Sequence, residues 1–185
     1  MSRRFLPTAC AALALSLAGC GGGGSSGGAA AHALGKQVVV NHTQIVSAGG
    51  RAPTTTLGVT VLEVRKGSQD ELRRAGFSVD PKAKSATPYY VDVRYANKGA
   101  QAIKRALDVG LEDQHGNLIT ATTIFNFGGQ RFAKCPKVSG GLLSPGKSYQ
   151  DCTLFLVPKG SKPGKVSFLP HDPKHETQFV YWNAG

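Results

Sequence analysis

The stretch "PYYVDVRYAN", residues 88–97, decides the fold class because apolar and polar side chains alternate along it. One face would carry an apolar series and the other a polar pair: Tyr89, Val91, Val93 and Tyr95 against Asp92 and Arg94. Successive side chains of a β-strand point to opposite faces, so a period of two is typical of a half-buried antiparallel strand.

Further stretches with the same period lie on both sides of this strand. They cover residues 36–47, 54–66, 102–127, 147–158, 165–170 and 176–182. The region 102–127 contains two or three strands around a turn at His115-Gly116-Asn117. Seven to nine short strands with turns between them predict an all-β protein, an immunoglobulin-like antiparallel β-sandwich.

One insertion interrupts the strands. The segment "SQDELRRAGF", residues 68–77, opens with Ser68 and has Glu71 three positions later, which is the pattern of a capping box. Gly76 supplies a helix stop. We therefore predict one short helix, followed by a loop through Thr87, and the length of residues 67–87 leaves the strand order at that edge open.

Residues 1–19 have the features of an export signal. Arg3 and Arg4 precede the apolar run 11–18, which is shorter than the about 20 residues that a membrane-spanning helix needs. The run ends in "LAGC", residues 17–20, which resembles the lipobox of bacterial lipoproteins. This resemblance implies that the chain is cut before Cys20, that Cys20 carries diacylglycerol, and that its new amino group accepts an acyl chain such as palmitate.

A glycine- and serine-rich segment follows the lipobox. Its composition predicts a flexible tether. We thus divide the chain into a signal peptide (1–19), a lipidated Cys20 with a flexible linker (20–35) and an immunoglobulin-like domain (36–185). The expected location is the cell membrane, with the lipid-anchored chain on the extracytoplasmic side and membrane lipid as the partner of Cys20.

Four cysteines are present in the sequence. Cys10 would leave with the signal peptide and Cys20 would carry lipid, so Cys135 and Cys152 remain. An even remainder in an oxidising compartment predicts a disulfide, Cys135–Cys152.

Three motifs connect this chain to a family. They are "YYVDVRYANKG" at 89–99, "LEDQHG" at 111–116 and "LSPG" at 143–146, which leads into a strand ending in Val157-Pro158. This pattern resembles the telokin-like, immunoglobulin-like extracellular domains of uncharacterised Gram-positive and actinobacterial lipoproteins, over about residues 59–182. The resemblance implies the sandwich fold and names no ligand.

The chain has a net charge of +11, and the surplus is uneven. Residues 131–165 contain one acid, Asp151, and seven basic residues: Arg131, Lys134, Lys137, Lys147, Lys159, Lys162 and Lys165. Such a surface suits anionic lipid headgroups or anionic envelope polymers, and export argues against nucleic acid. A solvated basic surface without a partner is the alternative, and strand alternation can send these lysines to opposite faces.

Candidate catalytic and ligand-binding motifs lack their required context. "GLLSPGKS", residues 141–148, matches a phosphate-binding P-loop, but a strand pattern follows Ser148 where a helix is required, so we expect no nucleotide. In "HDPKHE", Pro173 argues against a helix that would place His171 and His175 on one metal ion. Glu112, Asp113 and Asp151 are acids that nothing brings together. We expect no catalytic residue, no metal ligand and no cofactor.

Two aromatic side chains complete the candidate list. Tyr90 falls on the polar face of the 88–97 strand. Tyr90 and Trp182 are both candidates for a binding surface, and core packing is the preferred interpretation of Trp182. Together these patterns predict a cell-envelope lipoprotein with a non-enzymatic binding or interaction domain. An envelope protein is a further candidate partner. The alternatives are an accessory or inhibitory domain that docks on a wall enzyme, and an envelope hydrolase with an unrecognised site.

Overall fold

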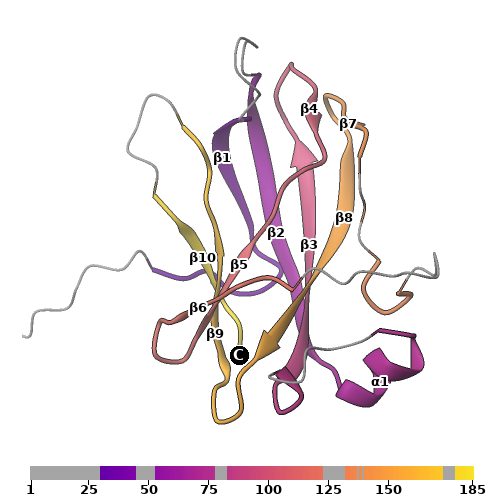
Figure 1. Cartoon of the computed structure of the whole chain (residues 1–185). Helices are drawn as coiled ribbons and strands as arrows, with labels where there is room; N and C mark the ends of the chain where they lie inside the picture. The colour runs from indigo at the N-terminus through magenta and orange to yellow at the C-terminus, as the bar shows by residue number, and fades with distance from the viewer. Residues whose placement is uncertain are drawn as a thin grey trace, which may run out of the picture.

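Two four-stranded antiparallel sheets form the body of the protein (Figure 1). The computed structural model describes residues 30–44, 53–77, 83–122, 132–136, 138, 140–172 and 178–185. The first sheet has the order β1 (Gln37–Thr43), β2 (Thr54–Lys66), β3 (Thr87–Asn97), β8 (Ser148–Val157). The second has the order β10 (Val180–Asn183), β9 (Pro163–Phe168), β5 (Gly110–Asp113), β6 (Leu118–Ile119).

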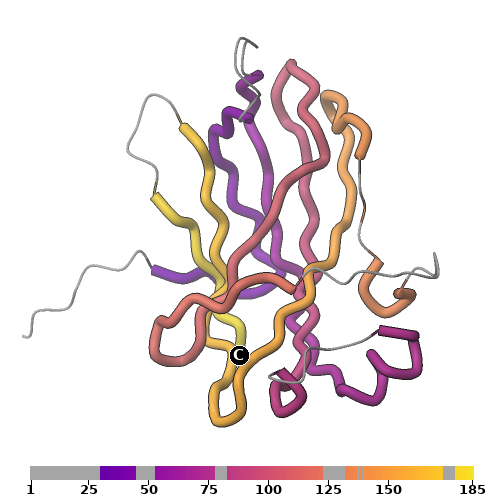
Figure 2. The backbone as a smooth tube through the Cα atoms, viewed as in Figure 1, coloured from indigo at the N-terminus to yellow at the C-terminus, as the bar shows by residue number. Residues whose placement is uncertain are grey.

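A third, two-stranded sheet pairs β4 (Ile103–Lys104) with β7 (Leu142–Leu143) at one end of the sandwich, as the backbone trace also shows (Figure 2). The described part of the chain thus contains ten strands, three of them only two residues long, and one helix, α1 (Gln69–Arg74). The predicted antiparallel β-sandwich with one short helical insertion is confirmed. No helix of the described residues is long and apolar enough to cross a membrane.

Strand β3 lies between β2 and β8 and follows the predicted alternation. Its apolar side chains enter the space between the two sheets, where they meet β9, β5 and β10. This inner core includes Leu57, Val59, Val61, Val91, Val93, Tyr95, Leu111, Phe155, Val166, Phe168 and Trp182. Trp182 is fully buried, as the sequence predicted, and its Nε1 donates to the Lys36 carbonyl at 2.9 Å.

The insertion after β2 forms the predicted helix α1 and covers one end of the outer face of the first sheet, around Tyr90 and Leu154. Ser68 caps the helix with both bonds of a capping box, and Gly76 has a positive φ of 81° directly after it. Because β2 and β3 are neighbours in the sheet, residues 67–86 are a long connection between adjacent strands and leave the strand order unchanged.

A second apolar cluster lies beneath α1, and Tyr90 belongs to it. Tyr90 is only 1% exposed, so the prediction that it forms part of an exposed binding surface is wrong. The other members of this outer cluster are Leu72, Phe77, Cys135, Cys152 and Leu154. Sequence reasoning counted Tyr90 with Asp92 and Arg94 on a polar face, but the inserted helix covers that position.

The Cys135–Cys152 disulfide joins the loop at 132–136 to β8, with the two Cα atoms 5.0 Å apart. Arg65 strengthens the same connection: its Nη2 donates to the Lys134 carbonyl at 2.8 Å and its Nε donates to Asp92 at 2.7 Å. The loop is therefore attached to the outer face by one covalent bond and one bridging side chain.

The first residues of the described chain already pack on the sandwich. His32 forms a parallel bridge with Trp182 of β10, and Asn183 N donates to the His32 carbonyl at 2.9 Å. Residues 30–35, which the sequence assigned to the linker, are thus in contact with the domain, which begins before Lys36.

Candidate functional site

The three motifs that carried the family resemblance hold turns together. Asn97, 1% exposed, uses its whole amide: Oδ1 accepts from Thr55 Oγ1 at 2.5 Å, and Nδ2 donates to the carbonyls of Gln101 and Leu143 at 2.7 and 2.9 Å. A Cβ at Gly99 would collide with Thr55, so this position requires glycine. These residues specify the fold and are not available for a ligand.

Asp113 has a similar structural role in the β5–β6 turn. Its carboxylate accepts from Asn117 Nδ2 at 3.0 Å, from Asn117 N at 2.9 Å and from His115 N at 2.8 Å. These hydrogen bonds lower the pKa of Asp113 to about 2. Asp151, the other acid considered for catalysis, lies on β8 and accepts from Val138 N at 2.9 Å. The structure shows no pairing of the two carboxylates among its described contacts.

The segment "GLLSPGKS" forms β7, a tight turn and the first residue of β8. The turn is closed by Lys147 N, which donates to the Ser144 carbonyl at 3.1 Å, and Gly146 N donates to the Asn97 carbonyl at 2.8 Å. The strand expected after Ser148 is present, so the helix that a P-loop requires is replaced by β8.

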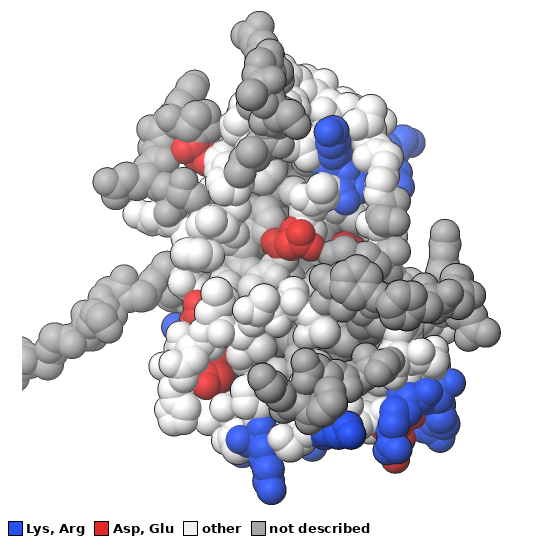
Figure 3. Space-filling view, viewed as in Figure 1, with Lys and Arg blue, Asp and Glu red and all other residues white. Residues whose placement is uncertain are grey.

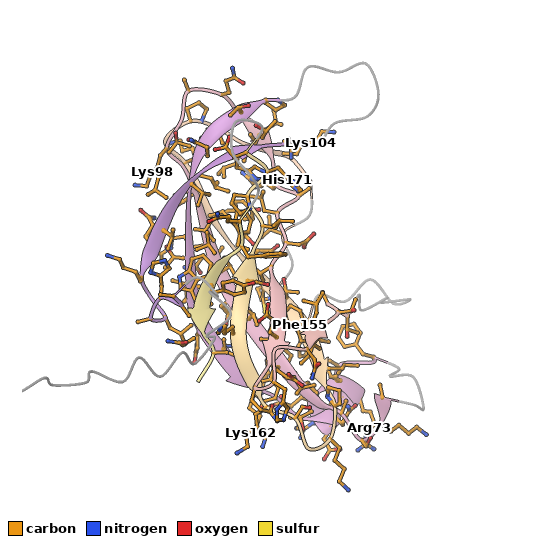
Figure 4. The ribbon with its side chains drawn as sticks, turned by 90° about the vertical axis from the view of Figure 1, so that its left-hand side faces the viewer. Arg73, Lys98, Lys104, Phe155, Lys162 and His171 are labelled. Atoms are coloured by element: carbon orange, nitrogen blue, oxygen red, sulfur yellow. A yellow bond between two sulfur atoms is a disulfide. The ribbon has the colours of Figure 1, made fainter. Side chains whose placement is uncertain are left out.

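Many of the exposed basic side chains in the described residues form two groups at opposite ends of the sandwich. Figure 3 shows Lys and Arg at the upper right and along the lower edge, with acidic side chains between them. Figure 4 places Lys98 and Lys104 at one end and Lys162 and Arg73 at the other. The ten residues of β8 separate the ends by about 30 Å. The basic stretch 131–165 is thereby divided, with Lys147 at one end and Lys159 and Lys162 at the other.

We name the lower group the α1 end. It comprises the exposed side chains of helix α1, of the strand junctions beside it and of the β8–β9 turn: Lys66, Arg73, Arg74, Lys84, Lys134, Lys159 and Lys162. Two of the cations are neutralised, because Arg73 pairs with Asp70 and Lys134 pairs with Glu71. Within the described residues no acid pairs with the other five.

The α1 end is also braced from the second sheet. Lys162 N donates to Gln114 Oε1 at 2.5 Å, and Gln114 N donates to the Lys162 carbonyl at 3.0 Å, which fixes the β8–β9 turn to the β5–β6 turn. The backbone of Lys162 is held in this way while its side chain stays exposed.

The opposite group, the β4–β7 end, is defined by Lys98, Lys104, Arg105 and Lys147. Arg105 is partly occupied: its Nε donates to the Leu142 carbonyl at 3.1 Å and its guanidinium lies over the Tyr149 ring at 5.7 Å. Among the described residues, three exposed lysines remain at this end, against five cations without an acidic partner at the α1 end.

The described chain enters the sandwich nearer to the α1 end. His32 pairs with Trp182, which in turn pairs with Val166, three residues after β9 begins at Pro163. Because the β8–β9 turn belongs to the α1 end, the first described residues lie nearer to that end than to the β4–β7 end.

One pair of residues escaped the sequence analysis. His171, considered only with His175 in its own loop, lies beside His42 of β1, with ring centroids 6.0 Å apart. The two are 129 positions apart in sequence. One backbone hydrogen bond, from Thr43 N to the His171 carbonyl at 2.6 Å, joins β1 to the segment that follows β9, and no local pattern indicates this contact.

Several sequence predictions lie outside the described residues. They concern Cys10, Cys20, Arg131, Lys137, Pro173, His175 and Glu176. Lipidation of Cys20 and the export signal therefore stay predictions.

No protein-family model matches this chain, and no curated protein matches it. Solved structures are similar to it. The secreted protein MPT63 of Mycobacterium tuberculosis is 14% identical, with a TM-score of 0.52, over 86% of this chain and 99% of that chain. At this identity the likeness concerns the fold, an antiparallel β-sandwich.

Two Bacillus subtilis proteins are similar at lower scores. The yjhA protein is 15% identical, with a TM-score of 0.48, over 82% of this chain and 99% of that chain. The ycdA protein, provisionally classed as a lipoprotein, is 17% identical, with a TM-score of 0.48, over 69% of this chain and 36% of that chain.

Proposed function

We propose that this protein is an extracytoplasmic lipoprotein, anchored to the cell membrane through Cys20, whose telokin-like domain binds anionic envelope surfaces with its α1 end and catalyses no reaction. The observation that supports this most is the gathering of five unpaired cations, Lys66, Arg74, Lys84, Lys159 and Lys162, at the end nearest to the point of entry of the chain. Nucleotide and nucleic acid are not among the proposed partners.

Anchor and charge would act together. The glycine- and serine-rich composition of residues 20–29 predicts a flexible tether, and a flexible chain of ten residues has an end-to-end distance of about 17 Å. The lipid would then hold the α1 half close to the headgroups. Each basic residue near an anionic surface contributes about 1 kcal/mol. A basic patch of this kind is one of the signals that add to a lipid chain in membrane anchoring.

The anchor is tested in cells. The full chain and its Cys20→Ser variant are expressed in a bacterium, the cells are fractionated, and the N-terminal peptide is analysed by mass spectrometry. We expect added diacylglycerol on Cys20 and release of the variant from the membrane. An unmodified peptide, or equal membrane retention of the two proteins, contradicts the anchor.

The binding end is tested with the full chain carrying Cys20→Ser, so that no lipid contributes. Its affinity for anionic and neutral vesicles is compared with that of Lys159→Gln/Lys162→Gln. Two lost cations are expected to weaken anionic binding by up to about 30-fold at low salt, and salt above physiological strength to abolish the difference. The matched control is Lys98→Gln/Lys147→Gln, which makes the same charge change at the β4–β7 end.

The outcomes distinguish binding through the α1 end from binding that depends only on the net charge of the domain. A larger loss in the Lys159/Lys162 variant supports the α1 end as the binding surface. Equal losses in both variants, or equal binding of the parent to neutral and anionic vesicles, overturn it. Isolated anionic wall polymer in place of vesicles tells the lipid surface from the polymer.

A free sheet edge favours the second candidate, docking on an envelope protein by strand addition. Strand β1 has one strand neighbour, β2, among the described residues, and Val39 at its centre is 52% exposed. An exposed edge offers unpaired backbone groups to another strand. Cross-linking in intact cells from a photoreactive residue at Val39 tests this: one reproducible protein adduct supports docking, and its absence contradicts it.

A further inference from the structure

The outer face of the second sheet carries two aromatic side chains that the core does not use. Phe179 directly precedes β10, and Tyr181 is the second residue of this strand. Because Val180 and Trp182 pack in the inner core and side chains alternate along a strand, Phe179 and Tyr181 point to the outer face. Their ring centroids lie 5.9 Å apart with the planes inclined by 31°, and Phe179 is 44% exposed. Two rings of similar orientation thus lie side by side on an exposed surface.

The Tyr181 ring lies across the neighbouring strand β9. Partial burial raises the pKa of Tyr181, and the charge and hydrogen bond of Glu112 on β5 raise it further, so the hydroxyl lies beside β5. Ser167 of β9, which pairs with Tyr181, points outward yet is only 1% exposed, because the ring that reaches from β10 toward β5 covers it. Lys165 Nζ lies 5.3 Å from the centre of the same ring. These contacts hold the ring in one orientation while part of it stays open to solvent.

Small residues form the centre of this face. Gly110 of β5 pairs with Ser167, and a Cβ at Gly110 would lie 2.7 Å from Ser167 Oγ and 3.3 Å from Leu118 Cδ1. Leu118 of β6 is 69% exposed at the far side of the sheet. The aromatic pair and Leu118 therefore flank a centre that carries no large side chain of its own.

Polar side chains lie in the next row of the same face. Lys165 of β9 is paired with Glu112 on one side and with Asn183 of β10 on the other, and Asn183 is exposed. In Figure 3 the described surface over these strands is mostly uncharged, with separate acidic side chains, and most of the visible Lys and Arg lie at its ends. This face therefore offers hydrogen-bond donors and acceptors beside the rings without a cationic field that would attract a polyanion.

We propose that this aromatic face, formed by Phe179, Tyr181, Glu112, Lys165 and Asn183, binds a neutral polysaccharide. The C–H bonds on the flat side of a sugar ring carry positive partial charge, which is attracted to the negative face of an aromatic ring. The 5.9 Å between the two ring centroids is close to the length of one pyranose unit, so successive sugars of a chain can contact successive rings. The polar row then hydrogen-bonds to the sugar hydroxyls.

A protein partner suits this face less well. A standard protein interface buries about 800 Å² on each partner around an apolar centre. Among the described residues of this face, the exposed large apolar side chains are Phe179 and Leu118, which lie on its two outermost strands with Ser167 and Gly110 between them. The apolar area is thus divided, as suits a narrow chain of sugar rings. The site lies away from the α1 end and does not depend on the proposed contact with anionic surfaces.

The test uses the full chain with Cys20→Ser and a panel of neutral hexasaccharides: cello-, chito-, manno- and maltohexaose. Calorimetry should show binding of at least one of them at millimolar concentration, with little change when salt is raised. Phe179→Ala and Tyr181→Ala should each weaken this binding about tenfold, through the loss of one stacked ring. Tyr181→Phe keeps the ring and should retain most of the affinity, which keeps the proposal testable if Tyr181→Ala fails to fold.

The matched control is Leu142→Ala, which removes a side chain that is 57% exposed at the β4–β7 end and should bind as the parent does. Lys159→Gln/Lys162→Gln should also bind the sugar normally, so failure of the α1 end and failure of the aromatic face give different results. Nuclear magnetic resonance adds a direct readout, because the ring signals of Phe179 and Tyr181 should move on addition of the sugar. Absence of binding to every hexasaccharide, binding that survives Phe179→Ala, or an equal loss in Leu142→Ala overturns the proposal.

Discussion

The inner face of the β1–β2–β3–β8 sheet packs against a second sheet, whereas its outer face packs against one short helix and a cross-linked loop. The inner core joins strands far apart in sequence and contains no covalent link. The outer cluster is small and depends on the disulfide, the α1 cap and the Lys134–Glu71 ion pair. The same sheet thus buries its side chains in two ways. The inner face does so by extensive apolar packing, and the outer face by a small cluster held by a disulfide, a helix cap and an ion pair.

Two neighbouring residues of β8 allow the stability contributions of the two faces to be compared directly. Phe155 is fully buried in the inner core and Leu154 is 4% exposed in the outer cluster. Phe155→Ala should lower the free energy of unfolding by about 3–5 kcal/mol, because a rigid core relaxes little around the cavity. Leu154→Ala should lower the free energy of unfolding by about 2 kcal/mol, the lower end of the usual range for such changes, because α1 can move inward and fill part of the cavity.

Urea denaturation followed by circular dichroism measures both variants. If Leu154→Ala is as damaging as Phe155→Ala, the two faces do not differ in the way described, and the outer cluster is as rigid as the inner core.

The disulfide should stabilise the outer face more than the inner core. Replacing both Cys135 and Cys152 by Ala opens a cross-link between residues 17 positions apart, which removes about 3 kcal/mol in the chain-entropy model. Hydrogen exchange should show that amides of α1 lose protection beyond the global change, while those at the centre of β2 and β3 follow it. An equal loss of amide protection in α1 and in the centre of β2 and β3 would show that the disulfide stabilises the whole sandwich.

Acid between pH 7 and pH 5 should lower the stability of the inner side and leave the outer cluster unchanged. His42 has a pKa of about 4 in the folded protein against 6.5 ordinarily, so the unfolded chain binds more protons between these values. Stability is then complete above about pH 6.5 and lost as the pH falls toward 4, by about 2 kcal/mol between pH 7 and pH 5. In the outer cluster burial raises the pKa of Tyr90 to about 12, so this ring stays neutral throughout.

Urea titrations at pH 7, 6 and 5 measure this slope. His42→Gln should remove most of it, and the Asp113 turn does not interfere because its carboxylate protonates below about pH 4. An unchanged slope in His42→Gln would assign the acid sensitivity to other groups.

Sequence patterns predicted those features that local chemistry determines. The alternation of residues 88–97 gave the faces of β3, and Ser68 with Glu71 gave the start of α1. The burial of Tyr90, the division of the basic stretch and the His42–His171 contact depend on which distant segments meet. Lys147 and Lys159 are close in sequence yet lie at opposite ends because a whole strand separates them, and no periodicity contains that information.

Removal of the α1 cap should have the smallest effect on stability. It tests whether the outer cluster unfolds as one unit with the sandwich. Ser68 Oγ accepts from Glu71 N at 3.2 Å, and Ser68 N donates to Glu71 Oε2 at 3.2 Å. Ser68→Ala loses the first bond and should cost about 1 kcal/mol, whereas Ser68→Asp keeps an acceptor and should cost less. Ser85→Ala, which changes an exposed serine of the same insertion, is the matched control.

If the outer cluster unfolds together with the inner core, the cost of Ser68→Ala appears in the global free energy of unfolding. If α1 opens by itself, the cost appears only as faster hydrogen exchange of the α1 amides, because local opening does not require the sheets to separate. The second result would make the outer face a separately opening unit, and an effect of Ser85→Ala equal to that of Ser68→Ala would remove the cap from the explanation.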